Sequence, residues 1–239
     1  DVVDHALAPI ILMHDSLGCV DLWRDFPAQL AQATARVVYA YDRLGFGLSD
    51  ASTQPLAHSF VITEAEQTFK AVLDYFSIQH FVILGHSVGG GMSVAIAAAY
   101  PERCQGLISI SAQYAVEALT LKGISEAKIG FQQAGQMERL ERYHPEKAQW
   151  VLDAWTETWL SPAFQDWNLA RVIDGVCCPT LIIHGELDEY GSTGQPQQIF
   201  EGVSGQAELH ILEDLHHMPH KEQPELVVAL IAEFHQAHC

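Results

Sequence analysis

The stretch that decides the fold reads FVILGHSVGGG and occupies residues 81–91. A short run of strand-forming residues leads into Gly-x-Ser-x-Gly, and a helical pattern of small residues follows. Ser87 is therefore predicted to lie on a tight strand-to-helix turn, where Gly85 and Gly89 lack the Cβ atoms that would clash. Such a turn exposes the hydroxyl, and the helix N-terminus directs N–H groups toward negative charge. We interpret Ser87 as a nucleophile rather than an incidental serine at a glycine-rich helix start.

Apolar runs before and after this stretch alternate with helical patterns. Strands are predicted at residues 9–13, 37–41, 81–84, 106–111, 179–184 and 208–212. Helices are predicted at residues 21–33, 60–76, 87–100 and 224–235. Strands that are continuously apolar and alternate with helices indicate an α/β fold, with a mostly parallel sheet covered by helices on both faces. A length of 239 residues suits one such domain.

One segment, residues 120–168, carries no strand signal and has a helical pattern throughout. Four of the five tryptophans fall within it, and two of them, Trp155 and Trp159, share a helix face with Leu152. Ordinary helix packing would explain this clustering. Because the segment is inserted between strands, we instead predict a helical cap whose Trp155 and Trp159 line a substrate pocket. The domain division is then 1–119 and 169–239 for the core and 120–168 for the cap.

The overall composition narrows the class of partner. The chain has 30 Asp and Glu against 12 Lys and Arg, a formal net charge of −18. This balance argues against binding to nucleic acid or to an anionic membrane, which both favour a basic surface. No apolar run approaches the roughly 20 residues that span a bilayer, and no secretory leader is recognisable. The five cysteines lack the spacing of a zinc site or a disulfide framework, so we expect reduced thiols, a cytoplasmic location and no metal.

A serine nucleophile needs a positioned base, which in turn needs an orienting carboxylate. Both residue types follow later predicted strands. The segment HGELDE at residues 184–189 offers three carboxylates, and EDLHHMPH at residues 213–220 offers three histidines and two more acidic residues. Several pairings of one carboxylate with one histidine are possible between these two segments. The chain order of serine, acid and histidine is that of the α/β-hydrolases.

Five motifs occur in order from His14 to Pro224, so nearly the whole chain is covered. They are His-x-x-x-Gly from residue 14, Asp-Arg-x-Gly-x-Gly-x-Ser from 42, the Gly-x-Ser-x-Gly stretch, His-Gly-x-x-Asp from 184, and His-x-Pro-x-x-Glu-x-Pro from 217. Together they are specific, and the chain resembles the α/β-hydrolase superfamily, in the branch of small serine esterases, enol-lactonases and carbon–carbon bond hydrolases. The resemblance implies an α/β-hydrolase fold.

The resemblance also implies the roles of single residues. Ser87 is the nucleophile, Asp188 the acid and His217 the base, because Asp188 and His217 stand where the last two motifs place the acid and base. The oxyanion hole is expected to use the backbone N–H groups of Val88 and Ser16. Two positions depart from the family pattern: Asp15 stands where the family usually has glycine, and His216 replaces another common glycine.

The function expected from these residues is hydrolysis of a small carboxylic ester or lactone through an acyl-enzyme. Hydrolysis of carbon–carbon bonds in ring-cleavage products is the alternative, since those members use a similar triad. A perhydrolase or acyltransferase, or a ligand-binding member without catalysis, remains open. The partner is expected to be a small acyl substrate and no cofactor is implied. A homodimer is among the open oligomeric states.

Overall fold

The computed structural model describes residues 3–238, so Cys239 and the first two residues lie outside the described range. Its centre is a six-stranded sheet with the order β2-β1-β3-β4-β5-β6. All neighbouring strands pair in parallel. The strands are β1 (Ile10–Met13), β2 (Val38–Ala40), β3 (Phe81–His86), β4 (Cys104–Ile110), β5 (Thr180–Gly185) and β6 (Ala207–Leu212). The structure thus confirms the predicted α/β sheet, with shifts of a few residues at strand ends.

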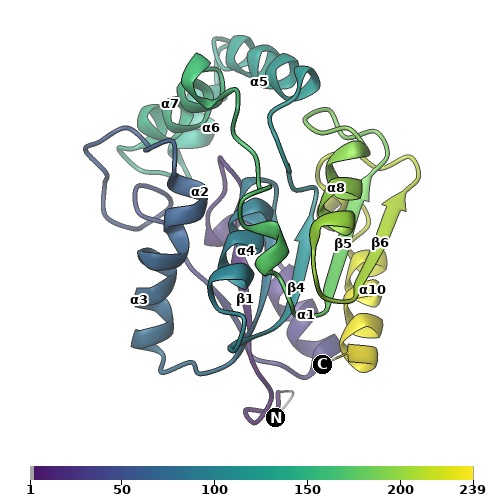
Figure 1. Ribbon diagram of the computed structural model, residues 1–239. Coiled ribbons are helices and arrows are strands. Elements are labelled where there is room, and N and C mark those ends of the chain that lie inside the picture. The colour runs from purple at the N-terminus through teal and green to yellow at the C-terminus, as the bar shows by residue number, and fades with distance from the viewer. Residues whose placement is uncertain (1–2, 239) are drawn as a thin grey trace.

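Helices cover both faces of this sheet (Figure 1). One face packs against α1 (Phe26–Thr34) and α10 (Pro224–His238), and the other against α3 (Thr68–Tyr75) and α4 (Val88–Ala99). The two faces follow from the alternation of side chains along each strand. In β3, Val82 and Leu84 join the first cluster while Phe81 and Ile83 join the second. Each fully buried side chain of this kind contributes about 1.5–3 kcal/mol through apolar burial.

Two predicted helices are interrupted. Instead of one helix over residues 21–33, a 3-10 turn (Val20–Trp23) precedes α1, and Arg24 between them has φ of 53°. Pro27 explains the break, because proline is accepted in the first turn of a helix but not in its interior.

The predicted helix over residues 60–76 is divided in a similar way. It consists of α2 (Phe60–Thr63), a 3-10 turn (Glu64–Glu66) and α3. The buried carboxylate of Glu64 accepts a hydrogen bond of 2.7 Å from the Tyr41 hydroxyl. This tertiary contact lies where the helix is interrupted, and apolar spacing alone does not reveal it.

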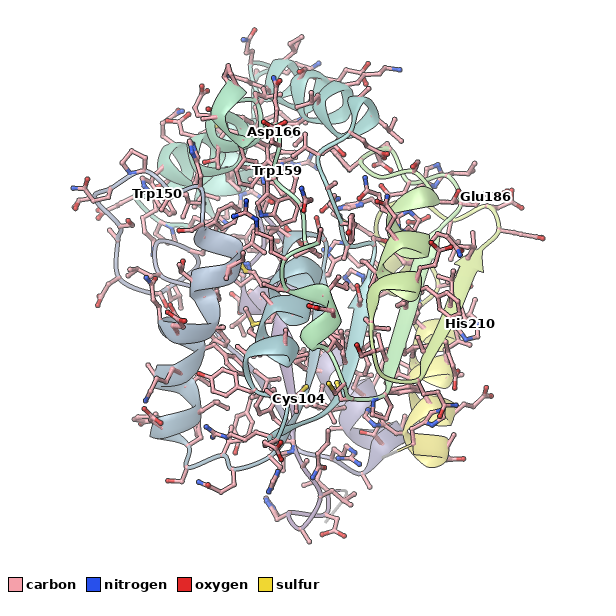
Figure 2. The ribbon with its side chains drawn as sticks, viewed as in Figure 1. Cys104, Trp150, Trp159, Asp166, Glu186 and His210 are labelled. Atoms are coloured by element: carbon pink, nitrogen blue, oxygen red, sulfur yellow. The ribbon has the colours of Figure 1, made fainter. Side chains whose placement is uncertain are left out.

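The segment that we predicted as a cap folds into α5 (Ala118–Gly130), α6 (Gln136–Glu141), α7 (Ala148–Trp159) and a 3-10 turn (Pro162–Phe164). These helices lie beyond the carboxyl ends of the strands, at the top of Figure 1. An antiparallel bridge joins Ala115 to Asn168, so the segment departs from the core and returns to it at one place. Trp159 points inward beneath these helices (Figure 2). The remaining helices are α8 (Gly194–Gly202) and the short α9 (Pro219–Glu222).

Candidate active site

Ser87 lies on the turn between β3 and α4 with φ of 58° and ψ of −126°. A non-glycine residue in this region typically costs about 1–3 kcal/mol and persists only where its surroundings hold it. Its backbone N–H donates to the Ile110 carbonyl at 2.9 Å, and its own carbonyl accepts from Gly90 N at 2.8 Å. A Cβ atom on Gly85 would lie 2.0 Å from the Gly89 carbonyl oxygen. The close approach of strand and helix therefore requires glycine beside the serine.

His217 and Asp188 meet at the ends of β6 and β5. The Nδ1 atom of His217 lies 2.8 Å from Oδ2 and 2.9 Å from Oδ1 of Asp188, and both side chains are buried. Burial raises the pKa of the Asp188 carboxyl, but the hydrogen bond and charge of His217 outweigh it and lower that pKa below its usual value. A carboxylate only accepts, so Nδ1 carries a proton, and in the neutral form of the ring Nε2 has a free lone pair.

The loop that carries His217 is held by the carboxylate of Glu222. This carboxylate accepts from the backbone N–H of His216 at 3.0 Å and from that of Met218 at 3.2 Å. The spacing from His217 to Glu222 in the last motif thus has a local structural reason. His216 points its ring at the same carboxylate, with Nδ1 at 3.2 Å from Oε2.

The other acidic and histidine candidates lie elsewhere. Glu189 accepts the backbone N–H of His217 at 3.3 Å rather than its ring, and Glu186 is exposed at the outer edge of the molecule (Figure 2). His220 is buried against the rings of Trp23 and His86. Asp188 and His217 are joined side chain to side chain, whereas His216 pairs with Glu222 instead.

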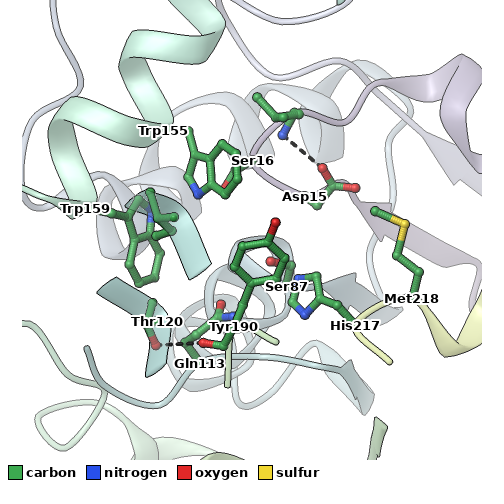
Figure 3. A pocket seen from close by; sticks show the side chains of 12 residues that line it. Asp15, Ser16, Ser87, Gln113, Thr120, Trp155, Trp159, Tyr190, His217 and Met218 are labelled. Carbon is green, nitrogen blue, oxygen red and sulfur yellow. Dashed lines mark hydrogen bonds between the residues drawn. The ribbon is translucent and has the colours of Figure 1, made fainter. Parts of the chain in front are cut away.

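A cavity of about 100 Å³ opens over Ser87 and His217 (Figure 3). Its lining residues come from the strand-end loops and from α5 and α7: Asp15, Ser16, Leu17, Ser87, Gln113, Thr120, Ile124, Trp155, Trp159, Tyr190, His217 and Met218. The structure thus brings Ser87, His217, Ser16, Trp155 and Trp159 to one cavity, with Asp188 bonded to His217. Val88 lines a smaller neighbouring cavity, which Ser16 and both tryptophans share.

Two lining residues, Tyr190 and Gln113, were missed by the sequence reasoning. The Tyr190 ring lies 4.8 Å from the His217 ring, and burial raises the pKa of its hydroxyl to about 12. Gln113 is buried, and its Oε1 has no hydrogen-bond partner within the described chain. Each follows a strand end by a few residues, and that position was the available signal, since site residues in parallel sheets gather there.

The side chains of His14 and Arg43 hold the peptide between Asp15 and Ser16 through its carbonyl oxygen. His14 Nδ1 donates to the Asp15 carbonyl at 2.8 Å, and Arg43 Nη2 donates to the same oxygen at 2.9 Å. The Arg43 backbone N–H donates to His14 Nε2 at 3.1 Å, which fixes the tautomer. Burial lowers the pKa of His14 well below its usual value, so the ring is neutral. Because C=O and N–H of a trans peptide point in opposite directions, the Ser16 N–H is directed away from Arg43.

Asp15, which replaces the usual glycine, has its own partners. Its Oδ1 accepts from Leu17 N at 2.9 Å, and its Oδ2 lies 3.3 Å from His86 Nδ1. His86 in turn donates from Nε2 to the His217 carbonyl at 2.8 Å. Asp15 is also outside the set of positive-φ residues. The backbone here therefore accepts a side chain, and the side chain ties the loop after β1 to the elbow.

A family model described as "alpha/beta hydrolase fold" matches residues 8–144, more than half of the chain. The chain belongs to the alpha/beta hydrolase fold family. This membership agrees with the parallel sheet and with the serine on its strand-to-helix turn. Within residues 3–238 no group of three metal-ligating side chains occurs, and no helix is long and apolar enough to cross a membrane.

Individual relatives are distant or partial. The chain is 32% identical over 107 residues to 1-acylglycerol-3-phosphate O-acyltransferase ABHD5 from Homo sapiens, covering 43% of this chain and 29% of that protein. The match thus spans less than a third of that relative. The fold is similar to 2-hydroxy-6-oxo-6-phenylhexa-2,4-dienoate hydrolase from Rhodococcus sp. strain RHA1, with a TM-score of 0.81, 17% identity and coverage of 98% and 92%. The enol-lactonase from Burkholderia xenovorans LB400 has a TM-score of 0.70, 20% identity and coverage of 97% and 93%.

Proposed function

We propose that this α/β-hydrolase cleaves a small carboxylic ester or lactone through an acyl-enzyme on Ser87, His217 and Asp188. The observation that carries the proposal is the buried bond between His217 Nδ1 and Asp188 beside a cavity that Ser87 lines. That bond leaves Nε2 of His217, a residue that also lines the cavity, as the nitrogen that can accept a proton. A serine on a strained turn, a neutral imidazole and a buried carboxylate are the parts that nucleophilic acyl transfer needs.

The proposed reaction has two halves. His217 Nε2 takes the proton of the Ser87 hydroxyl while Oγ attacks the carbonyl carbon, and the negative charge develops on the carbonyl oxygen. The N–H groups of Val88 and Ser16 are the proposed donors to that oxygen, and one such donor is typically worth about 10²–10³ in rate. The imidazolium then protonates the leaving alkoxide, and water, activated by the same nitrogen, releases the acid and restores Ser87.

Carbon–carbon bond hydrolysis is the rival reaction on a similar triad. The Rhodococcus relative is named as a dienoate hydrolase, so its substrate carries a carboxylate. Among the described residues, the cavity lining of this chain includes neither lysine nor arginine. Such a lining offers no permanent cation to a substrate carboxylate, which favours an ester or lactone. The human relative is named as an acyltransferase, so an acceptor other than water is a second variant of the same acyl-enzyme chemistry.

The test is chemical labelling followed by substrate comparison. A fluorophosphonate probe is expected to modify the protein at Ser87, and a Ser87→Ala variant is expected to remain unlabelled. p-Nitrophenyl acetate is expected to be hydrolysed faster than a vinylogous diketone. Equal labelling of the variant would exclude the assigned nucleophile, and turnover of the diketone without ester hydrolysis would favour the rival reaction.

A further inference from the structure

The ring of Tyr190 is held between the loop of the proposed base and the cap helices. Tyr190 lines the main cavity and follows Asp188 by two positions. Its ring centroid lies 4.8 Å from that of His217 and 5.8 Å from that of Trp155 on α7. A Cβ atom on Gly123 of α5 would lie 2.9 Å from Cδ1 of Tyr190, so α5 also approaches the ring closely. Three separate elements therefore fix the position of this ring.

The backbone of Tyr190 is held on both sides as well. Its N–H donates to Oδ1 of Asp188 at 2.8 Å, and its carbonyl oxygen accepts from Oγ1 of Thr120 at 2.7 Å. The first bond joins Tyr190 to the carboxylate that orients His217, and the second joins it to α5 of the cap. With the ring and the backbone both held, the direction of the hydroxyl is set before a substrate binds. A donor fixed in this way needs no rearrangement when charge develops in the reaction.

The hydroxyl of Tyr190 points into the cavity, toward the wall on which Asp15 and Ser16 lie (Figure 3). It makes no hydrogen bond to another group of residues 3–238, so its proton is available to a bound molecule. Burial raises the pKa of this hydroxyl to about 12, which keeps the proton in place at neutral and mildly alkaline pH. Tyr190 thus offers a free hydrogen-bond donor within the cavity that Ser87 lines.

We propose that the Tyr190 hydroxyl is a third donor to the carbonyl oxygen of the substrate, beside the N–H groups of Val88 and Ser16. The inference rests on the proposed ester or lactone hydrolysis. The leaving oxygen has to lie near Nε2 of His217, which protonates it, whereas the carbonyl oxygen has to lie near the Ser16 N–H. Because the hydroxyl points toward the Ser16 side, the carbonyl oxygen is its acceptor. As Oγ of Ser87 bonds to the carbon, the carbonyl π pair moves onto this oxygen, and Tyr190 keeps its proton while the hydrogen bond strengthens.

The expected effect of removing this donor follows from other oxyanion holes. Loss of one donor typically costs about 10²–10³ in rate, and two donors remain here, so we expect a loss of at least about tenfold. The same loss should appear in the affinity for any compound that forms a stable tetrahedral oxyanion on Ser87. A donor to the leaving group would act differently, since a compound that has no leaving group would bind the variant unchanged.

The test uses the full chain and the variant Tyr190→Phe, which keeps the ring and its packing and removes only the hydroxyl. Tyr75→Phe is the matched control, because Tyr75 on α3 is 82% exposed and lies outside the cavity lining. The first measurement is kcat/KM on p-nitrophenyl acetate, at a temperature where thermal unfolding shows each variant to be folded. The second is the inhibition constant of trifluoroacetone, whose carbonyl carbon adds Oγ of Ser87 to give a hemiketal oxyanion without a leaving group.

In Tyr190→Phe, kcat/KM should fall and the inhibition constant should rise, each by at least about tenfold, with both unchanged in Tyr75→Phe. A fall in kcat/KM with an unchanged inhibition constant overturns the inference, because the hydroxyl then serves the leaving group or another step. Wild-type values of both in Tyr190→Phe also overturn it alone, provided the ester is hydrolysed and the probe labels Ser87. Absence of both labelling and turnover in the wild-type protein overturns the proposed function together with this inference.

Discussion

Removing the carboxylate of Glu222 should loosen the loop that carries His217. In Glu222→Ala, the backbone N–H groups of His216 and Met218, on either side of the histidine, lose acceptors at 3.0 and 3.2 Å. Hydrogen bonds to a charged group contribute about 1.5–3 kcal/mol each, and less where water can replace the lost partner. The Glu222 side chain is 29% exposed, so we expect the free energy of unfolding to fall by about 1–3 kcal/mol.

The same change should lower kcat/KM by more than the loss of folded protein explains. Misplacement of a catalytic group by about 1 Å can cost about 10²-fold in rate, so we expect kcat/KM on p-nitrophenyl acetate to fall by about tenfold to a hundredfold. Urea titration measures the stability change and steady-state kinetics, under conditions where the variant is folded, measure the rate. Glu222→Gln should retain part of both, since its amide oxygen still accepts one N–H group.

The control is Glu213→Ala, which removes an exposed carboxylate from the same strand-end loop. It should leave stability within about 0.5 kcal/mol of the wild-type value. If Glu222→Ala behaves like this control in both stability and kcat/KM, the loop is positioned by other contacts and the reasoning is refuted.

Three further predictions concern the triad, the turn and the buried histidines. Asp188→Asn should lower kcat by about 10³–10⁴-fold with the fold retained, because the amide favours the wrong tautomer of His217; near-wild-type kcat would contradict this role. Gly89→Ala should abolish labelling by the fluorophosphonate probe and lower Tm, because its Cβ would lie 2.2 Å from a carbonyl oxygen of β1. A Cβ atom at Gly130 meets open space, so Gly130→Ala should keep the labelling and the Tm of the wild-type protein. Burial lowers the pKa of His235 to about 4, so between pH 6.5 and pH 4 the unfolded chain binds a proton that the folded chain does not. The contribution of the neutral His235 to the free energy of unfolding is therefore complete above pH 6.5 and is lost as the pH falls toward 4. Urea titrations across that range should show a shallower loss in His235→Leu, and an unchanged slope would contradict this.

The sheet was predictable because most of its strands are apolar runs that alternate with helical patterns. In β3 every residue is buried, and no competing pattern of period 3.6 is present. The helix over residues 60–76 was predicted as one unit because its apolar spacing is correct. Its interruption coincides with a hydrogen bond from the Tyr41 hydroxyl to Glu64, more than twenty positions away along the chain, and local spacing does not encode such a contact.

The site residues that could be predicted are those that follow a predicted strand and also belong to a motif. Asp188 and His217 were chosen among neighbouring carboxylates and histidines by resemblance, and their side chains are joined in the structure. Tyr190 and Gln113 belong to no motif, so only the folded loops bring them to the cavity. The contact between Asp15 and His86 could not be predicted either, because His86 lies on a strand 71 residues further along the chain.

The central claim is that Ser87 forms an acyl-enzyme, and mass spectrometry of that intermediate tests it most directly. The protein is mixed with p-nitrophenyl acetate, quenched in acid within the first turnover, digested and sequenced by fragmentation. The account predicts one acetyl group on Ser87, formed with a stoichiometric burst of p-nitrophenol and absent in Ser87→Ala. Hydrolysis of the ester at the wild-type rate in Ser87→Ala, or an acetyl group on another residue whose loss abolishes turnover, would contradict it.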